Sequence, residues 1–515
     1  MLTLALFGLP ILSSAQTYPL FTTSEDIDIA NIKAPHSVHG DILTATSGRF
    51  CEFPKGSGKN IATISTLWMG AYDATSALKC AAKMYRADAS DYWPGPADTL
   101  SISDAQRYAM RQSWARIWKV NSSEIDAFLL LSTHTVANTP APILEWPAKG
   151  NSHAKGAGGA VLNITEDMAP FVDVNTDGVY DPLAGDYPKM KGSQMLWWII
   201  NDANNPHPVS STNEMKMEIK MSAFAYKMGT VADNIIFYEY EITNKSASIY
   251  SAYRMGIMAD FDLGQAFDDY TGFDSTHRMG IVYNGSPIMS PITGMAMLEQ
   301  PGDVYGIYTP LGSYAPFQNG ISAVGDPQNG VEFYRLMNSQ TRTGIPITSG
   351  SKGERMECDS MVTPGDRRFV IASRDYSFSP GQTRKFGAAM IAADSAGGCP
   401  NINFSQLHQA ADTAFKLYWN SFRVTPPGTS NGIAAIQRSS LRMFPNPATS
   451  RLYVETAGQS KGMLNIYDAL GRSVTLPQTP TAKGFELNTS ILPTGVYSIR
   501  HQSGTTIETG IFVKE

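Results

Sequence analysis

The chain has 515 residues, of which 43% are hydrophobic and 17% charged, with a formal net charge of -6 and a pI near 5.8. Nucleic acids and anionic membranes are bound through concentrated positive charge, so this mildly acidic balance argues against both as partners. The length predicts more than one domain. The 44 Gly and 31 Pro residues are typical of a turn-rich protein, and we expect a mainly β fold.

Residues 1–16, MLTLALFGLPILSSAQ, contain an apolar run of the length of a signal-peptide core, followed by the small residues Ser14 and Ala15. This pattern predicts a signal peptide that is recognised by the general export machinery and cleaved after Gln16, although no Lys or Arg precedes the run. An ordinary buried N-terminal segment is the alternative. No later stretch approaches the roughly 18 consecutive apolar residues of a membrane span, so we expect no transmembrane segment.

The four cysteines are Cys51, Cys80, Cys358 and Cys399. Export makes disulfides possible, and pairing Cys51 with Cys80 and Cys358 with Cys399 is the simplest of the three connectivities. No C-x-x-C arrangement occurs, so the cysteines give no support for a zinc site or for dithiol redox chemistry.

Apolar residues change from alternation to helical spacing near residue 103. The stretch SDAQRYAMRQSWARIWKV predicts a helical insertion over about 103–133. Ser103 or Asp104 can cap its first helix, and Asn121 with Glu124 can start a second one.

Two long regions are expected to be β-rich, and the first of them contains this insertion. Residues 17–195 contain short strands, and residues 196–423 carry alternating runs such as NIIFYEYEITNK, which are typical of a β-sandwich. The second region is expected to end in an amphipathic helix over 405–422, with Ser405 as its N-cap.

The C-terminal part of the chain is predicted to be a separate small domain. Residues 424–440 are rich in Pro, Gly, Ser and Thr, which is typical of an interdomain linker. Residues 441–515 contain short alternating strands separated by Gly or Asn, enough for one small β-sandwich.

Four segments of this small domain carry a recognisable pattern. FPNPATSRLYVE, NIYDALGRSV, LPTGVYSIR and IFVKE closely resemble the type A C-terminal sorting domain of the type IX secretion system of Bacteroidetes. The motif residues are Pro445, Asn446, Pro447, Gly471, Arg472, Gly495, Tyr497 and Lys514. A generic fibronectin-like module is the alternative.

The resemblance implies a destination for the chain. It implies an immunoglobulin-like or fibronectin-like sandwich that the outer-membrane translocon and its sorting and attachment machinery recognise after passage through the periplasm. The cargo would then be secreted or attached to lipopolysaccharide at the cell surface.

The preceding 400 residues resemble, less sharply, a family of cargo proteins from the same bacteria. The resemblance is carried by EFPKGSG, STLWMGAYD, DYWPGP, PFVDVNTDGVYDPLAGDYPKMKGSQMLWWIIND and ADFDLGQAFDDYTGFD. It supports the β-rich fold and implies no activity.

Oxygen-bearing groups recur through DVNTDGVYD, residues 173–181. The candidate ligands are the side chains of Asp173, Asn175, Asp177, Asp181 and Asp186 and the carbonyl of Val179. Their spacing matches the first nine positions of an EF-hand-like loop, with Gly178 at the sixth, and predicts a structural calcium site. The twelfth position is Ala184 rather than Glu, so the bidentate ligand must come from Asp186 or elsewhere. A solvated series of Asx turns, or magnesium, is the alternative.

A second acidic stretch, ADFDLGQAFDDYTGFD, offers the carboxylates Asp260, Asp262, Asp268, Asp269 and Asp274. Carboxylates this close repel one another unless a cation neutralises them, so the stretch is a possible second calcium site. Solvated side chains on a long β-hairpin are an equal alternative. A glycosidase pair is a third, although spacing in sequence does not give spacing in space.

Tryptophans offer a test of glycan binding. Trp93, Trp197 or Trp198 could form a stacking platform for a sugar ring. Adjacent strand residues point to opposite faces, so at most one of Trp197 and Trp198 can join a given platform, and we expect both to be buried.

The sequence favours an exported, structural or adhesive protein with calcium-stabilised loops, and it leans against an enzyme. A secreted carbohydrate-active enzyme or peptidase is one alternative, and a module that binds a surface glycan is another. An enzyme needs convergent titratable groups in a deep pocket, and a glycan binder needs a shallow cleft with exposed rings.

Overall fold

The computed structural model describes residues 18–44, 50–85, 89–97, 102–204, 206–285, 291–347, 354–356, 363–394, 402–424, 438–456, 464–468, 473–503 and 506–515. Strands make up 40% of the structure and helices 12%, which confirms the prediction of a mainly β fold. The chain divides into two compact units, Met1–Thr429 and Ser430–Glu515. The expected signal peptide and residues 425–437 of the expected linker lie outside the described residues.

The larger unit is built on two antiparallel sheets. Sheet I has the order β1-β2-β3-β6-β15-β21-β19, with β7 against β6 and β22 against β15. Its strands are β1 (Ser24–Ile27), β2 (Ala34–Ser37), β3 (Asp41–Ile42), β6 (Ile64–Tyr72), β7 (Leu78–Ala81), β15 (Tyr250–Asp260), β19 (Ser313–Gln318), β21 (Arg367–Ala372) and β22 (Tyr376–Phe378).

Sheet II has the order β20-β16-β17-β18-β23-β14-β13-β12-β8, with β9 against β12. Its strands are β8 (Trp93–Pro94), β9 (Trp118–Asn121), β12 (Gln194–Asn201), β13 (Met217–Ala225), β14 (Ile235–Asn244), β16 (Asp269–Asp274), β17 (Met279–Asn284), β18 (Ile292–Glu299), β20 (Glu354–Met356) and β23 (Thr383–Ala393). Two short ladders complete the unit, β4 (Cys51–Glu52) with β5 (Asn60–Ala62) and β10 (Phe171–Val172) with β11 (Tyr187–Pro188).

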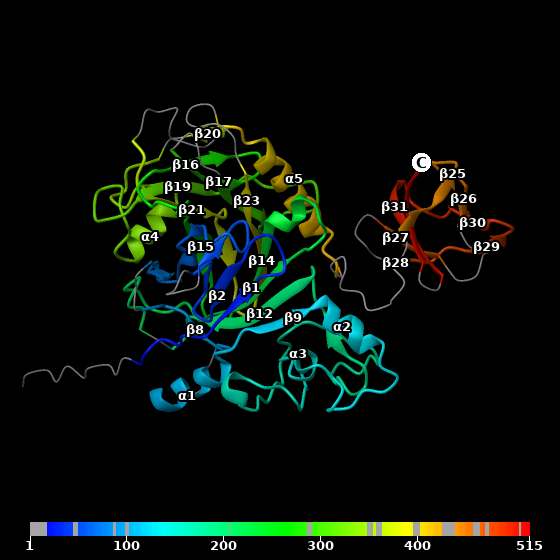
Figure 1. Ribbon diagram of the computed structural model, residues 1–515, viewed down its shortest axis with the longest axis horizontal. Coiled ribbons are helices and arrows are strands. Elements are labelled where there is room, and N and C mark those ends of the chain that lie inside the picture. Colours follow the sequence, from blue (N-terminus) through cyan, green and yellow to red (C-terminus); the bar gives the residue numbers. More distant parts are fainter. Residues whose placement is uncertain are drawn as a thin grey trace, which may run out of the picture. The chain divides into compact units, whose positions relative to one another are not determined.

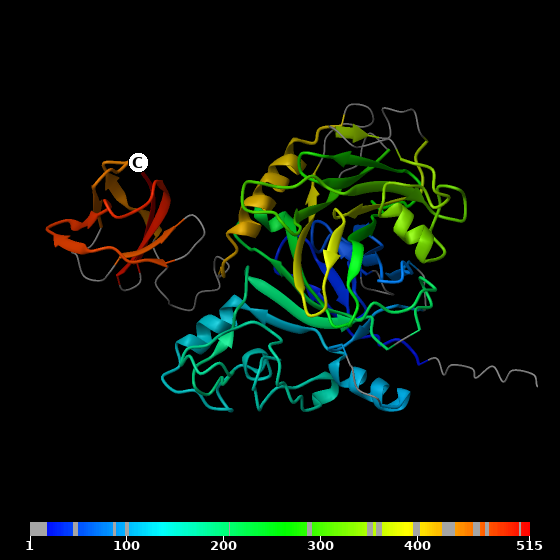
Figure 2. The ribbon, with the colours of Figure 1, turned by 180° about the vertical axis from the view of Figure 1, so that it is seen from behind.

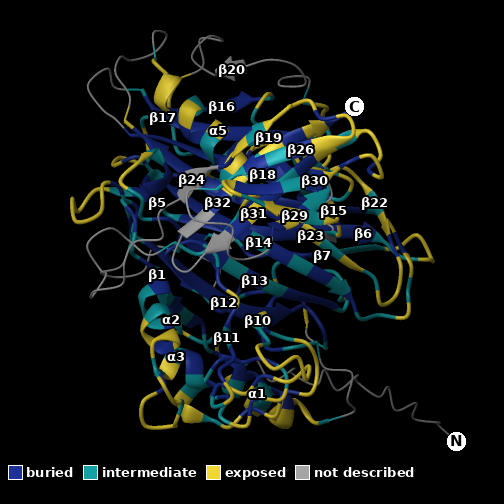
Figure 3. Cartoon of the chain, turned by 90° about the vertical axis from the view of Figure 1, so that its right-hand side faces the viewer, coloured by how far each residue is buried: buried dark blue, intermediate teal, exposed yellow. Residues whose placement is uncertain are grey.

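Sheet II is buried on both faces, as β12 shows. Successive side chains of a strand point to opposite faces. Trp198 therefore packs in the core between the sheets, whereas Trp197 packs on the outer face against Trp118 and Trp146. Both are 1% exposed, which confirms the expectation of buried core, and Trp93 is buried as well. Burial runs through the strands of both sheets (Figure 3).

Helices cover the outer faces of the two sheets (Figures 1 and 2). On sheet I, α4 (Gly330–Leu336) packs Phe333 and Leu336 against Trp68 and Val370. On sheet II, α5 (Ser405–Trp419) packs along β23 and β18. The helices α1 (Asp104–Trp114), α2 (Ser122–Leu129) and α3 (Ala141–Leu144) gather beside β8 and β9. Short 3-10 turns are η1 (Ala157–Gly159) and η2 (Val231–Asn234).

The predicted helices are present, with one difference in capping. Ser103 caps α1, and the carboxylate of Glu124 accepts a hydrogen bond from the backbone N–H of Asn121 at the start of α2. In α5, Ser405 is the first helical residue and Phe404 takes the N-cap position without a side-chain cap, while the side chain of Asn403 accepts the backbone N–H of Ser405. Asn403 thus satisfies one of the backbone N–H groups that have no partner within the first turn of the helix.

The expected boundary near residue 195 does not divide two compact units. The strand β6 pairs with β15 in sheet I, and β9 pairs with β12 in sheet II, so both sheets combine strands from before and after this point. Residues of both regions share the core between the sheets. Residues 17–195 and 196–423 are therefore described together as one sandwich with a helical insertion.

The expected Cys51–Cys80 disulfide is not formed, and both cysteines are buried free thiols. Cys51 packs in the core between the sheets, whereas Cys80 packs in the cluster beneath α4 on the other face of sheet I. A sheet separates the two sulfur atoms. Cys358 and Cys399 lie outside the described residues.

The smaller unit is a β-sandwich. One sheet has the order β24-β32-β31-β27-β28 and the other β25-β26-β30-β29. The strands are β24 (Arg438–Ser440), β25 (Arg442–Phe444), β26 (Arg451–Glu455), β27 (Leu464–Asp468), β28 (Ser473–Val474), β29 (Gln478–Thr481), β30 (Gly484–Asn488), β31 (Gly495–Ser503) and β32 (Thr506–Lys514). Leu452, Ile466 and Phe512 contribute to its core.

Among the described residues, no helix combines the length and the apolar character that a membrane span requires.

A buried histidine makes the larger unit sensitive to acid. The Nε2 atom of His39 accepts the backbone N–H of Phe21 at 2.9 Å, so its Nδ1–H must donate to the carbonyl of Tyr92, also at 2.9 Å. Burial, with a smaller effect of the nearby Lys83 ammonium, lowers the pKa of His39 to about 4. A second proton would remove the acceptor that Phe21 needs.

We expect acidification from pH 6.5 to 4.5 to destabilise the unit, because the unfolded chain takes up a proton at His39 that the folded chain refuses. The contribution of this residue is on the order of 2 kcal/mol. His39→Gln should reduce the loss of unfolding free energy over this range by about that amount, measured by urea titration. His153→Gln, at a partly exposed histidine, is the control. Equal acid sensitivity of His39→Gln and the wild-type chain would refute this account.

Candidate functional site

The first acidic loop, residues 173–181, is closed by hydrogen bonds from its own backbone. Asp173 accepts the N–H groups of Thr176 and Gly178, at 2.7 and 2.8 Å. Asp186 is fully buried, and its two oxygens accept the N–H groups of Val174 and Asp181, at 2.8 and 2.9 Å. These carboxylates hold the loop in shape as Asx-type acceptors.

The remaining predicted ligands of this loop face solvent. Asn175, Asp177, Val179 and Asp181 are exposed, and Asp177 accepts the N–H of Val179 at 2.8 Å. Among the described residues, the groups of His, Cys, Asp or Glu whose ligand atoms converge lie elsewhere. Calcium at this loop stays a prediction.

The second acidic stretch forms a cluster at one end of the sandwich. We call Asp260, Asp262, Asp268, Asp269 and Asp366 the carboxylate cluster. Asp260 ends β15, Asp269 begins β16, and Asp366 precedes β21. One oxygen from each of Asp260, Asp262 and Asp366 lies within 4.8 Å of the others. The cluster joins strands of sheet I, β15 and β21, to a strand of sheet II, β16.

One arginine partly neutralises the cluster. The guanidinium of Arg368 is buried and lies 2.9 Å from Asp260 Oδ2 through Nε and 3.5 Å from Asp366 Oδ1 through Nη2. Its Nη1 lies 2.5 Å from Asp326 Oδ1. A single positive charge shared among these groups can balance at most one of the five carboxylates of the cluster.

Crowding and burial disfavour the ionised forms of two cluster residues. Burial raises the pKa of Asp260 to about 8, although Arg368 opposes the shift, and Asp262 and Asp366 add to it. Burial and the nearby charge of Asp262 raise the pKa of Asp269 to about 9. Buried carboxylates with neighbours of the same sign take up protons or bind a cation.

The buried side chain of Asp269 makes few hydrogen bonds. Its side chain is fully buried, and Oδ2 accepts only a long hydrogen bond from the N–H of Leu263, at 3.4 Å. Within the part of the chain that the structure describes, Oδ1 has no hydrogen-bond partner. Buried polar atoms are ordinarily paired, so this oxygen requires a proton or a ligand. Hard oxygen donors gathered in this way suit calcium.

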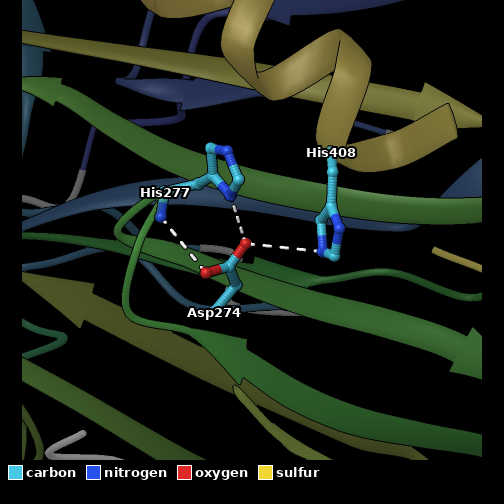
Figure 4. A group of neighbouring side chains, drawn as sticks. All are labelled: Asp274, His277 and His408. Atoms are coloured by element: carbon cyan, nitrogen blue, oxygen red, sulfur yellow. Dashed lines mark hydrogen bonds and ion pairs between the residues drawn. The ribbon is translucent and has the colours of Figure 1, made fainter. Parts of the chain in front are cut away.

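Asp274, which sequence grouped with these carboxylates, does not belong to the cluster. It ends β16, whereas Asp269 begins it, and five strand steps separate the two residues by about 16 Å. Asp274 instead faces two histidines, His277 and His408 (Figure 4). Sequence reasoning missed His408, Asp366 and Arg368 because each comes from a distant part of the chain. It also missed His277, which lies only three residues after Asp274. The triplet Asp366-Arg367-Arg368, whose arginines begin β21, was a weak signal for Asp366.

An open cavity lies elsewhere on the larger unit. Its volume is about 610 Å³, and its lining includes Asp73, Lys79, Glu214 and Lys216 but none of the carboxylate cluster. Lys79 lies 3.8 Å from Asp73, and Lys216 lies 3.3 Å from Glu214. The carboxylates of this cavity are thus paired with lysines of the same wall.

In the smaller unit, the Pro445-Asn446-Pro447 motif contacts the last strand. Asn446 donates through Nδ2 to the carbonyl of Ile511 at 3.0 Å and accepts the N–H of Val513 at 2.9 Å. Just after the motif, Ala448 extends this contact by donating its N–H to the carbonyl of Val513 at 2.7 Å.

The other motif residues lie along β31 and β32. Gly495 begins β31, and Tyr497 stacks on Phe512 and donates its hydroxyl to the carbonyl of Pro493 at 2.9 Å. Lys514 ends β32 with its side chain largely buried. Gly471 and Arg472 lie outside the described residues.

Residues 442–515 match the family described as the secretion system C-terminal sorting domain. The chain is a cargo protein of the type IX secretion system. It is exported and then secreted or attached to the cell surface. The sorting domain implies interaction with the type IX machinery. The comparison with curated proteins found no match.

Three solved structures with similarity to the chain have low TM-scores. A candidate kojibiose phosphorylase from the human microbiome has a TM-score of 0.23 at 8% identity, with 44% of this chain and 21% of that chain covered. A polysaccharide lyase has a TM-score of 0.19 at 8% identity, with 68% of this chain and 40% of that chain covered. A candidate aldose 1-epimerase from Escherichia coli K12 has a TM-score of 0.26 at 9% identity, with 72% of this chain and 99% of that chain covered. The chain thus spans 21% and 40% of the length of the first two proteins, and these TM-scores do not establish a shared fold.

The contact between Asn446 and β32 generates a prediction for the sorting domain. Asn446→Ala removes two hydrogen bonds that fasten the end of the chain, and we expect it to destabilise the smaller unit by about 1 kcal/mol. Faster amide hydrogen exchange in residues 506–515 and a smaller fraction of chain recovered outside the cell should follow. Asn465→Ala, on the exposed face of β27, is the matched control. Unchanged exchange and export of Asn446→Ala would contradict the assignment.

Proposed function

We propose that residues 18–424 form a structural or adhesive module that the type IX route delivers to the cell exterior and that calcium rigidifies at the carboxylate cluster. The observation that carries this proposal is the fully buried Asp269, whose Oδ1 has no partner among the described residues and faces a crowd of like charges. A dication satisfies this oxygen and removes the repulsion in one step.

The choice of cation follows from the donors. The cluster supplies carboxylate oxygens, which are the ligands that calcium prefers, and it supplies them from separate elements that can adjust to the flexible coordination of calcium. Magnesium requires a near-ideal octahedral arrangement and keeps several water ligands, and a buried group of carboxylates leaves little space for those waters.

The position of the cluster supports a mechanical role. Asp260 ends β15 and Asp366 precedes β21 in sheet I, while Asp269 begins β16 in sheet II. A bound cation would link the two sheets directly, beyond the apolar core between them. A module that must keep its shape outside the cell gains from such a link, because a ligand bound only by the folded state raises stability.

A catalytic role for the same carboxylates has less support. A glycosidase needs an acid and a second carboxylate that both reach the substrate. Asp260 and Asp269 are fully buried, and the cluster lines none of the 610 Å³ cavity. The proposal also includes a surface glycan or lipopolysaccharide as a binding partner. It includes calcium bound at residues 173–181 as well.

Calcium titration of the full chain tests the proposal. The eight tryptophans all precede residue 430, so tryptophan fluorescence follows unfolding of the larger unit alone. At a calcium concentration of 100 times the Kd, the unfolding free energy should rise by about 2.7 kcal/mol, which raises the melting temperature by several degrees, and chelator should reverse the change.

Variants separate the cluster from the loop. Asp269→Asn keeps the shape of the side chain and lacks its charge, so it should abolish most of the calcium-dependent rise. It should leave the chelated protein at least as stable as the wild type, because it removes a carboxyl group whose burial disfavours the ionised form. Asp173→Asn should affect only calcium bound at residues 173–181. Asp167→Asn, at an exposed carboxylate, is the matched control. A melting temperature that neither calcium nor chelator moves would overturn the proposal.

A further inference from the structure

Two histidines and two aspartates meet where α5 crosses the turn between β16 and β17. We call Asp274, His277, His408 and Asp412 the His–Asp group. Asp274 ends β16 and His277 lies three residues later in the turn, while His408 and Asp412 are one helical turn apart on α5. Residues at this i, i+4 spacing share a helix face. Figure 4 shows both rings turned toward the Asp274 carboxylate.

The three inner side chains present donor atoms to a common point. One oxygen of Asp274 and one ring nitrogen from each of His277 and His408 lie within 4.8 Å of one another. Asp274 Oδ2 is in short contact with His277 Nδ1 and lies 3.6 Å from His408 Nε2. The rings of His277 and His408 stack, with centroids 5.4 Å apart.

Surrounding groups fix the orientation of these donors. Asp274 Oδ1 accepts the backbone N–H groups of Thr276 and His277, at 2.8 and 3.2 Å, which leaves Oδ2 directed at the rings. Asp412 Oδ1 lies 3.2 Å from Nε2 of His277. A histidine that binds a metal through one nitrogen ordinarily donates its other N–H to a carboxylate, and Asp412 stands in that outer position.

We propose that the His–Asp group binds a divalent first-row transition metal, with Zn²⁺ as the cation to test, through Asp274 Oδ2, His277 Nδ1 and His408 Nε2. Imidazole nitrogens suit zinc and its neighbours in this row, whereas calcium and magnesium prefer oxygen donors. Three protein ligands leave one tetrahedral position for water. Asp274 is 1% exposed, but the side chain of His408 is 29% exposed, so the group opens to solvent at that ring.

Metal binding has a defined proton balance at this group. The proton between His277 Nδ1 and Asp274 Oδ2 leaves to solvent, and the nitrogen lone pair and the carboxylate oxygen both bind the metal. The N–H at Nε2 stays on the ring and donates to Asp412. The metal would fasten α5 to the end of β16, a role separate from the calcium proposed between the sheets.

Zinc competition with a chromophoric chelator, on the full chain without a histidine tag, tests the proposal. The wild-type chain should hold one zinc ion that calcium does not displace. His408→Gln should weaken zinc binding by at least 100-fold, and Asp412→Asn by about 10-fold, the range for an outer carboxylate. His153→Gln is the matched control, and Asp269→Asn should leave zinc binding unchanged.

Cobalt provides a second measurement on the same proteins. Co²⁺ in the site should give the visible absorption of a nitrogen- and oxygen-ligated ion, and His408→Gln should remove it. His408 and Asp412 are partly or largely exposed, so these variants should fold, which tryptophan fluorescence checks. The proposal would be overturned if His408→Gln and Asp412→Asn bound zinc as tightly as the wild-type chain, or if the wild-type chain bound none. The group would then be an Asp–His ion pair only.

Discussion

Burial of sheet II on both faces is the constraint on which the larger unit depends. Its strands must be apolar on the face that meets sheet I and on the face that meets α5 and the helical insertion. The neighbours Trp197 and Trp198 illustrate this, because Trp198 packs in the core between the sheets and Trp197 packs in the core on the outer face of sheet II. The helices therefore complete the apolar core on the outer face of sheet II. The chain passes from β15 in sheet I to β16 in sheet II through a loop at the edge of the sandwich.

Charged side chains that do not fit in the apolar cores gather at that edge of the sandwich. The loop between β15 and β16 brings Asp262 and Asp268 between the fully buried Asp260 and Asp269, and Arg368 offsets only part of their charge. A calcium ion would complete the link between the sheets. At the other end of β16, Asp274 meets histidines, so one short strand of six residues separates a group of oxygen donors from a group with nitrogen donors.

The sequence predicted what depends on local pattern. Alternation indicated the strands, helical spacing with Ser103 and Glu124 located the insertion, and the ordered motif from Pro445 to Lys514 indicated the sorting domain. It did not predict pairings that depend on long-range topology. Division at residue 195 overlooked that β6 pairs with β15, and pairing Cys51 with Cys80 overlooked that they lie on opposite faces of sheet I. Grouping Asp274 with Asp269 treated neighbours in sequence as neighbours in space.

The central claim is that a calcium ion links the two sheets at the carboxylate cluster. A crystal structure of the full chain grown with saturating calcium tests it most directly. The account predicts an anomalous-scattering peak bound by oxygens of Asp269, Asp260, Asp262 and Asp366 at about 2.3 to 2.6 Å, the calcium–oxygen range. A cluster without such a peak, with its carboxylates placed as they are now, would contradict the account.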